Sequence, residues 1–221
     1  MRFVFLGPPG VGKGTQAENV GVQKNIPHIS SGNLLREAIK DGSEIGFKAK
    51  NFIDRGLLVP DDLIVSIVIS EIDSSKCRNG FILDGFPRNN SQAEILDCTL
   101  TGKGIQLDRV FYFTASEHII IERIAGRRIC TSCDAQYHIL YKPPLKENIC
   151  DKCGSMILQR KDDNPDTVLV RLKVYQEQTE GLIEYYKRNK KLVEINCNGD
   201  VIEIRKKILA VLGSVEDGGV R

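Results

Sequence analysis

The sequence lacks the features that mark several large classes of protein. No apolar run approaches the ~20 residues that a membrane-spanning helix needs, and the apolar start, residues 1–6, is too short for a secretion signal. The net charge is +2 and aromatic residues make up 6% of the chain, so neither a strongly basic surface nor many stacking rings are available for nucleic acid. We therefore expect a cytoplasmic protein without membrane or nucleic-acid partners.

The cysteines also exclude one class, the secreted domain with a closed set of disulfides, because their number is seven, an odd number. Four of them form two C-x₂-C pairs separated by sixteen residues: Cys130, Cys133, Cys150 and Cys153. Paired knuckles at this spacing can place four thiolates tetrahedrally, which suits Zn²⁺, with an iron–sulfur centre as the competing use of the same ligands. Because four sulfurs leave no open coordination position, we expect a structural metal.

Strands alternate with helices along most of the chain, which predicts an α/β fold with a parallel sheet covered by helices on both faces. Apolar runs predict strands at residues 3–6, 80–85, 109–113 and 192–197, and we expect about five strands in all. One long helix is expected from the cap Asn164 onward, and a last helix from Asp200 that ends at Gly213 before a frayed tail.

Two segments interrupt this alternation. Residues 30–59 contain two short helical patterns, and residues 126–163 contain short polar pieces with the four clustered cysteines. We expect these segments to be inserts on a core formed by residues 1–29, 60–125 and 164–221.

The stretch FVFLGPPGVGKGTQ, residues 3–16, matches the pattern G-x-x-x-x-G-K from Gly7 to Lys13. Glycines let backbone N–H groups turn inward around an anion, and the helix that follows directs its positive end to the same place. Lys13 adds a mobile charge, although Gly14 stands where the pattern usually has serine or threonine, and Thr15 follows one residue later. The loop is therefore predicted to bind polyphosphate. Asp84, which ends the apolar run FILD, is expected beside it as a Mg²⁺ ligand, directly or through water.

Six motifs follow one another in the chain: GPPGVGKGTQ, ISSGNLLRE, DRGLLVPDD, DGFPRNNSQ, IAGRR and RKDDNPDTVLVRL. In this order they resemble the adenylate kinase family, in its bacterial variant with a zinc-bearing lid, from Met1 to about Leu212. The resemblance implies transfer of the γ-phosphoryl group of Mg-ATP to AMP, giving two molecules of ADP. It also implies a helical AMP-binding insert over residues 30–59, a zinc-binding lid over residues 126–163, and a monomer.

The resemblance further implies which residues contact each substrate. The ATP side would contain Gly10, Val11, Gly12, Lys13, Gly14, Thr15, Arg123, Arg127, Gln136, Tyr137 and Gly199. The AMP side would contain Ser31, Arg36, Leu57, Leu58, Val59, Gly85, Phe86, Pro87, Arg88, Gln92, Arg160 and Arg171, with Gln92 at the adenine edge. The catalytic set would be Lys13, Arg88, Arg123, Arg160 and Arg171.

Elementary chemistry agrees with a catalytic set made of cations. A phosphomonoester has its second pKa near ~6, so AMP is already an anionic nucleophile at neutral pH and needs no catalytic base. Catalysis then depends on alignment and charge neutralisation, for which arginine suits because it is permanently charged and grips phosphate oxygens in a bidentate fork.

Three other functions compete with this one. A kinase for another nucleoside monophosphate would share most of these motifs, because only Gln92 and the GLLV stretch favour AMP. A zinc-ribbon ATPase acting on nucleic acid would use the cysteine knuckles for docking, against the lack of basic excess. A GTPase switch would need an N-K-x-D motif, which the sequence does not contain.

Overall fold

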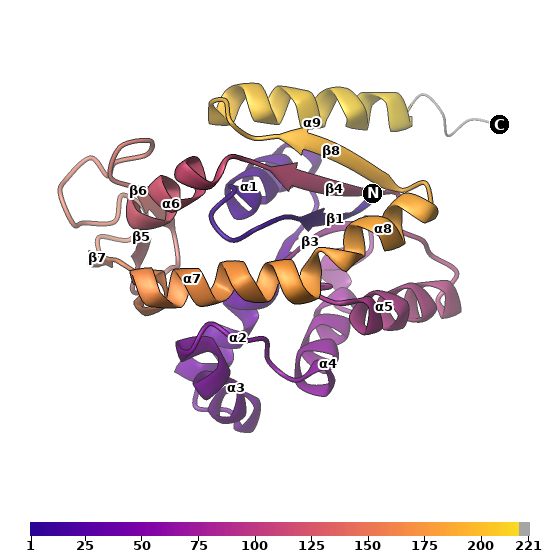
Figure 1. Ribbon diagram of the computed structural model, residues 1–221, viewed down its shortest axis with the longest axis horizontal. Coiled ribbons are helices and arrows are strands. Elements are labelled where there is room, and N and C mark those ends of the chain that lie inside the picture. Colours follow the sequence, from indigo (N-terminus) through magenta and orange to yellow (C-terminus); the bar gives the residue numbers. More distant parts are fainter. Residues whose placement is uncertain (217–221) are drawn as a thin grey trace.

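The computed structural model describes residues 1–216 and contains a central sheet of five parallel strands (Figure 1). Their order across the sheet is β2-β3-β1-β4-β8. The strands are β1 (Arg2–Leu6), β2 (His28–Ser30), β3 (Phe81–Asp84), β4 (Arg109–Thr114) and β8 (Leu192–Asn196). The α/β class and the number of strands predicted from the sequence are confirmed.

Helices cover both faces of this sheet, so its inner strands are continuous apolar runs. Alternate residues of β1 belong to two separate apolar clusters: Val4 and Leu6 to one, Phe3 and Phe5 to the other. The first cluster includes residues of α4 (Asp61–Ile72), α5 (Asn90–Gly102) and α8 (Gly181–Arg188), and the second includes residues of α1 (Lys13–Lys24) and α9 (Val201–Glu216). Each face of the sheet therefore has its own core.

The helices begin and end close to where caps and periodicity predict. Asn164 caps α7 by accepting a hydrogen bond from Thr167 N at 2.9 Å, with Pro165 in the first turn. The helices are α1 (Lys13–Lys24), α2 (Ser31–Lys40), α3 (Glu44–Asp54), α4 (Asp61–Ile72), α5 (Asn90–Gly102), α6 (Glu117–Ala125), α7 (Pro165–Val174), α8 (Gly181–Arg188) and α9 (Val201–Glu216). Short 3₁₀ turns occur at Ser75–Cys77 and Lys161–Asp163. Within residues 1–216, none of the helices has the length and apolar character needed to cross a membrane.

Two groups of elements project from the central sheet in different directions (Figure 1). One is the pair α2 and α3, within residues 30–59. The other is a small antiparallel sheet within residues 126–163, of β5 (Arg127–Cys130), β6 (Gln136–His138) and β7 (Ile157–Leu158), in the order β6-β5-β7. We call these segments the helical insert and the lid.

Three details differ from the sequence predictions. Strand β2 was not predicted, because a three-residue edge strand is too short to show a pattern. The long helix expected after Asn164 is interrupted by a π-helical segment, Tyr175–Thr179, where Glu180 N donates to Tyr175 O at 3.1 Å. Gly213 does not end α9, which continues to Glu216, so the prediction of a cap there was wrong. Residues 217–221 of the predicted tail lie outside the described residues.

Candidate functional site

A cleft of about 1200 Å³ opens where β1 and β3 end, which is the edge of a parallel sheet at which ligands usually bind. Its wall includes the loop between β1 and α1, residues of the helical insert, the lid, and α6, α7 and the start of α9. Residues far apart in the sequence therefore meet around one space.

The glycine loop is pressed against its surroundings so closely that side chains would not fit. Gly10 has φ +82°, and a Cβ on it would lie 2.4 Å from the side chain of Ile124 on α6. Gly7 has φ +143°, and its Cβ would lie 2.5 Å from the carbonyl oxygen of Phe113. The loop therefore takes a path that only glycine allows, and Gly10 to Thr15, all predicted ATP contacts, line the cleft.

Lys13 lies at the centre of this loop. Its Nζ donates to the carbonyl oxygens of Gly7 at 2.7 Å and Pro8 at 2.9 Å, so the ammonium is folded back over the loop. Burial, together with the nearby arginines, lowers the pKa of Lys13 to about 8, although the carboxylate of Asp84 opposes this shift. An anion in the cleft would therefore favour the charged form of Lys13.

Asp84 ends β3 beside the glycine loop, as the sequence predicted. A Cβ on Gly14 would lie 3.3 Å from Asp84 Oδ2, so the missing side chain at this position lets the carboxylate approach the loop. Burial opposes ionisation of Asp84, but a 3.3 Å contact with His28 Nε2 and the charges of Lys13 and Arg88 hold its pKa below the usual value. No pattern in the sequence pointed to His28, which contacts Asp84 from β2.

Arginines dominate the rest of the cleft. Six that were predicted from the resemblance line it: Arg36, Arg88, Arg123, Arg127, Arg160 and Arg171. A seventh, Arg205 of α9, also lines the cleft and was not predicted. Burial and the charges of neighbouring arginines lower the pKa of both Arg88 and Arg160. Because these cations lie close together, a ligand that carries several negative charges would bind favourably among them.

Two acidic residues of the lid neutralise part of this charge. Asp163, whose side chain is 0% exposed, accepts hydrogen bonds from Arg127 and, at 3.1 Å, from Arg171. Asp162 accepts a further bond from Arg171 at 3.1 Å. The sequence showed these aspartates within a motif but did not identify them as partners of the arginines.

Other donors of the cluster have no partner. The buried Nε atoms of Arg36 and Arg160 make no hydrogen bond to any of the described residues. A buried donor without a partner costs about 1–3 kcal/mol, and more when it is charged. These two atoms therefore indicate an anionic ligand between the helical insert and the lid.

Arg123 differs from the other five because its guanidinium already holds two backbone segments. It donates to Val11 O at 3.0 Å in the glycine loop and to Gly199 O at 3.1 Å before α9. It thereby connects two predicted parts of the ATP site.

The predicted AMP residues gather around a smaller cavity of about 70 Å³. Apolar side chains of Leu57, Val59 and Ile64 form part of its wall, and Gln92 also lines it. The buried hydroxyl of Ser31 donates to Gly85 O at 2.6 Å. The remaining predicted residues that line it are Leu58, Arg36, Arg88 and Arg171, whereas Pro87 and Arg160 line the larger cleft. Phe86, 1% exposed, packs in the core instead.

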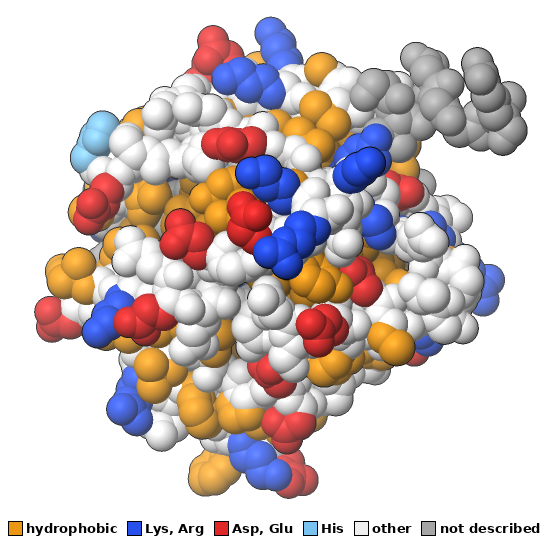
Figure 2. Space-filling model, turned by 45° about the vertical axis from the view of Figure 1, so that its right-hand side comes forward, with side chains coloured by type: hydrophobic (Ala, Val, Ile, Leu, Met, Phe, Trp, Pro, Cys, Tyr) orange, Lys and Arg blue, Asp and Glu red, His pale blue; other side chains and the backbone are white. Residues whose placement is uncertain are grey.

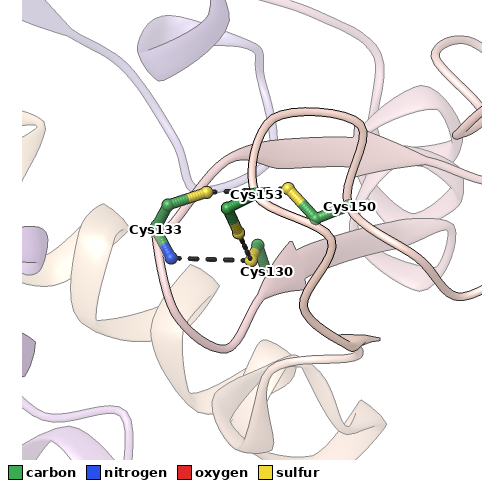
Figure 3. A group of neighbouring side chains, drawn as sticks. All are labelled: Cys130, Cys133, Cys150 and Cys153. Atoms are coloured by element: carbon green, nitrogen blue, oxygen red, sulfur yellow. Dashed lines mark hydrogen bonds between the residues drawn. The ribbon is translucent and has the colours of Figure 1, made fainter.

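The four clustered cysteines of the lid converge in space (Figure 3). Their sulfurs all lie within 4.8 Å of one another, with Cys130 and Cys153 at 3.4 Å and Cys133 and Cys150 at 3.6 Å. Four thiolates at about 2.3 Å from a tetrahedral Zn²⁺ would lie about 3.8 Å apart, and S–S bonds are about 2.05 Å long. The spacing therefore fits a shared metal ion and does not fit disulfides.

Comparison of the sequence with known proteins shows to which family the chain belongs. The family model for adenylate kinase matches residues 5–191. The chain is 47% identical over 213 residues to an adenylate kinase of Caldicellulosiruptor saccharolyticus, covering 96% of this chain and 99% of the relative. It is 46% identical to that of Clostridioides difficile, covering 97% and 99%, and 47% identical to that of Acetivibrio thermocellus, covering 98% and 100%. The chain belongs to the adenylate kinase family.

Membership of the adenylate kinase family confirms the resemblance found in the sequence, and with it the prediction of a phosphotransferase. It sets aside the GTPase switch and the zinc-ribbon ATPase. On the face drawn in Figure 2, Lys and Arg side chains are interspersed with Asp and Glu. This face therefore lacks the continuous basic surface that a nucleic-acid-binding ATPase would use.

Two lid residues have surroundings that the sequence did not reveal. Tyr137, predicted beside ATP, lines the cleft, but its hydroxyl lies 3.3 Å from Cys150 Sγ and accepts a hydrogen bond from Asp151 N at 2.8 Å. It therefore joins the cysteine cluster to the cleft. His138, next to Gln136 and Tyr137 on β6, is 9% exposed and packs over Gly126, where a Cβ would lie 2.3 Å from its ring. The close packing of His138 on Gly126, the residue that follows α6, therefore requires glycine.

Proposed function

We propose that this protein transfers the γ-phosphoryl group of Mg-ATP to AMP, reversibly, giving two molecules of ADP. The observation that carries the proposal is the cluster of Lys13 and six arginines in one cleft, with unpartnered buried Nε atoms on Arg36 and Arg160. Two nucleotides whose phosphates meet head to head would bring the negative charge that this cluster lacks.

The donor would bind with its phosphates in the glycine loop. Backbone N–H groups of residues 10–15 and the positive end of α1 would bind the phosphate oxygens, with Lys13 on the outer phosphates. Mg²⁺ bound with ATP would be held by Asp84, directly or through water, and would neutralise charge on the phosphates. The base of the donor would lie near Gly199, before α9, whereas Arg123 and Gln136 lie against the glycine loop and would face the phosphates. Tyr137, which also lines the cleft, would lie on the same ATP side.

The acceptor would bind between the helical insert and α7. Its base would enter the smaller cavity beside Leu57, Val59 and Gln92, and its phosphate would meet Arg36 and Arg88. The AMP phosphate is already dianionic above its second pKa of about 6, so no side chain needs to remove a proton. Arg88, Arg160 and Arg171 would stabilise the charge of the transferring group, a contribution of about 10³–10⁵ in rate for an arginine in that role.

We further propose that Cys130, Cys133, Cys150 and Cys153 hold a structural Zn²⁺ in the lid. The metal would fix the small sheet that carries Arg127, Gln136 and Tyr137, so that closing the lid excludes water from the phosphoryl group. We also propose that the core, helical insert and lid act as three units, and that the protein is a cytoplasmic monomer.

A coupled assay of ADP formation with ATP, Mg²⁺ and a panel of AMP, CMP, UMP and GMP tests this function. We expect ADP formation that depends on AMP and is weakest with GMP. Preference for another acceptor would make the protein a different nucleoside-monophosphate kinase. ATP hydrolysis without any acceptor, together with a salt-dependent gel shift on DNA or RNA, would contradict the proposal in favour of a nucleic-acid-dependent ATPase.

A further inference from the structure

Gln92, at the start of α5, is held in a network of hydrogen bonds beside the smaller cavity. Its Nε2 donates to Asp61 Oδ1 at 2.6 Å, and its Oε1 accepts from the backbone N–H of Arg88 at 2.7 Å. Asn89, the cap of α5, accepts from Gln92 N at 2.8 Å and donates its own amide to both Asp61 oxygens, at 3.0 and 3.2 Å. The side chain of Gln92 is 2% exposed, so this network rather than solvent determines its orientation.

The two partners of Gln92 fix which way its amide faces. The backbone N–H of Arg88 can only donate a hydrogen bond, so its partner must be the amide oxygen. The ionised carboxylate of Asp61 can only accept, so its partner must be the amide nitrogen. Rotating the amide by 180° would place donor against donor at Arg88 and acceptor against acceptor at Asp61. Both bonds would then be lost in a buried site.

The amide nitrogen of Gln92 has two N–H groups and its oxygen has two lone pairs, and the network uses one of each. One N–H and one lone pair therefore remain for a ligand. Adenine offers an amino donor beside the ring acceptor N1, which matches an amide oxygen and an amide N–H in one order. Hypoxanthine and guanine offer a carbonyl acceptor beside an N1–H donor, which needs the opposite order. A Gln92 amide that cannot rotate therefore discriminates between 6-amino and 6-oxo purines, although a free amide could pair with either.

We propose that Asp61 is a positioning residue for acceptor selectivity, which fixes the Gln92 amide in the orientation that pairs with a 6-amino base. This rests on the proposed function, in which Gln92 faces the acceptor base. Asp61 contacts that base only through Gln92, and it is the first residue of α4, a helix that packs on the central sheet. The start of α4 thereby determines how the Gln92 amide is oriented toward the acceptor base.

Asp62, the next residue, provides a matched control. Both aspartates lie in the first turn of α4, so replacing either removes one negative charge from the same helix end. Asp62 is exposed, and among the described residues Gln92 has its side-chain bonds with Asp61 and Arg88 rather than with Asp62. A difference between the two variants therefore reports on the contacts that Asp61 makes with Gln92 and with Asn89, the cap of α5.

The test compares AMP with inosine 5′-monophosphate, which differs from AMP in the base only at position 6 and N1. We expect Asp61→Ala to reduce the ratio of kcat/KM for AMP over inosine monophosphate by about tenfold to a hundredfold, the usual range for one oriented base contact. The loss should occur mainly in KM for AMP, because the phosphoryl-transfer residues are untouched. Asp62→Ala should keep the wild-type ratio, and Asp61→Asn, which retains an oxygen for Gln92, should fall between them.

Both acceptors are measured on one preparation of each variant, so a partly unfolded sample lowers both rates and leaves their ratio unchanged. An unchanged ratio in both Asp61→Ala and Asp61→Asn, while wild type phosphorylates AMP, would overturn the role of Asp61 and leave the proposed function intact. If wild type does not phosphorylate AMP at all, the proposed function itself fails. An equal fall of the ratio in Asp62→Ala would assign the effect to the helix end and also overturn the inference.

Discussion

The central sheet and the lid are held together by different means. Both faces of the central sheet bury large apolar clusters, with Phe3, Phe5, Phe111 and Leu83 among residues that are 0% exposed. The buried cluster of the lid consists of Cys130, Ala135, Tyr137, Cys150 and Ile157. Two of these five are cysteines of the proposed metal site, so the lid contains little apolar surface that would keep it folded without a metal.

The difference indicates how stability and function are divided along the chain. The central sheet carries the glycine loop and Asp84 on a core of buried apolar side chains, whereas the lid carries Arg127, Gln136 and Tyr137 on a small sheet that the proposed metal would hold. The cleft lies between the central sheet and the lid. More cationic than anionic side chains line it, so a bound anion would stabilise it. Changes in these three places should therefore have separable effects.

The largest effect is expected in the cleft. Lys13→Met and Arg88→Ala should each lower kcat/KM for phosphoryl transfer by about 10³-fold or more, because each removes a cation from the transferring phosphates. The thermal midpoint should change little or rise, since both groups are buried cations that are costly in the free protein.

Arg78→Ala is the matched control for Arg88→Ala, because Arg78 is exposed at the opposite end of β3. It should leave the rate unchanged. If Arg88→Ala kept more than a tenth of the wild-type rate, Arg88 would not contact the transferring group.

Removal of metal should produce the next largest effect and should be confined to the lid. After chelation we expect backbone amides of β5, β6 and β7 to lose protection in hydrogen exchange, while those of β1, β3 and β4 keep it. Metal analysis should give about one zinc per chain in the untreated protein, and Cys150→Ser should lower that content and the activity together.

Cys98→Ser serves as the control, since Cys98 is an exposed cysteine on α5, outside the cluster. It should retain metal and activity. Loss of protection throughout the central sheet after chelation would mean that the two regions do not fold independently.

A moderate effect is expected from pH. Because burial lowers the pKa of Lys13 to about 8 in the free protein, kcat/KM for ATP should fall as the pH rises through about 8 and the ammonium deprotonates. The slope should approach tenfold per pH unit, and kcat at saturating ATP should fall later, because bound phosphate raises the pKa of the lysine. A flat profile of kcat/KM between pH 7 and pH 9 would contradict the role of Lys13.

The smallest effect is expected at the contact between the lid and α1. Lys152, between two cysteines of the cluster, lies 3.0 Å from Glu18 Oε1, and both side chains are partly exposed. Exposed pairs contribute about 0.2–1 kcal/mol, so Lys152→Ala should raise KM for ATP by about twofold or less. A double-mutant cycle with Glu18→Ala should show coupling at low salt that disappears at about 1 M salt. Coupling that persists at high salt would contradict an electrostatic contact.

Much of the fold was predictable because its signals are local. Strands β1, β3, β4 and β8 are apolar runs, Asn164 and Pro165 mark the start of α7, and glycines mark the loop before α1. Strand β2 could not be predicted, because its three residues become a strand only by pairing with β3. The π-helical segment between α7 and α8 was not predicted either, because we found no residue pattern that marks it.

The functional site likewise has features that could be predicted from the sequence and features that could not. The glycine loop, the arginines and the cysteine knuckles stand in motifs and could be named from the sequence. The contacts of His28 with Asp84 and of Asp61 with Gln92 join residues 56 and 31 positions apart, so only the folded chain reveals them. Tyr137 was predicted on the ATP side, but its hydroxyl contact with Cys150 depends on the turn of the lid.

The most direct test of the central claim, that one cage of cations aligns two nucleotides end to end, is competition by a bisubstrate analogue in which two adenosines are joined by five phosphates. We predict one analogue per chain, displacement of both ATP and AMP, and affinity well above that of either substrate, because the analogue satisfies the whole cluster at once. Displacement of one nucleotide alone, or binding no tighter than ATP, would contradict the claim.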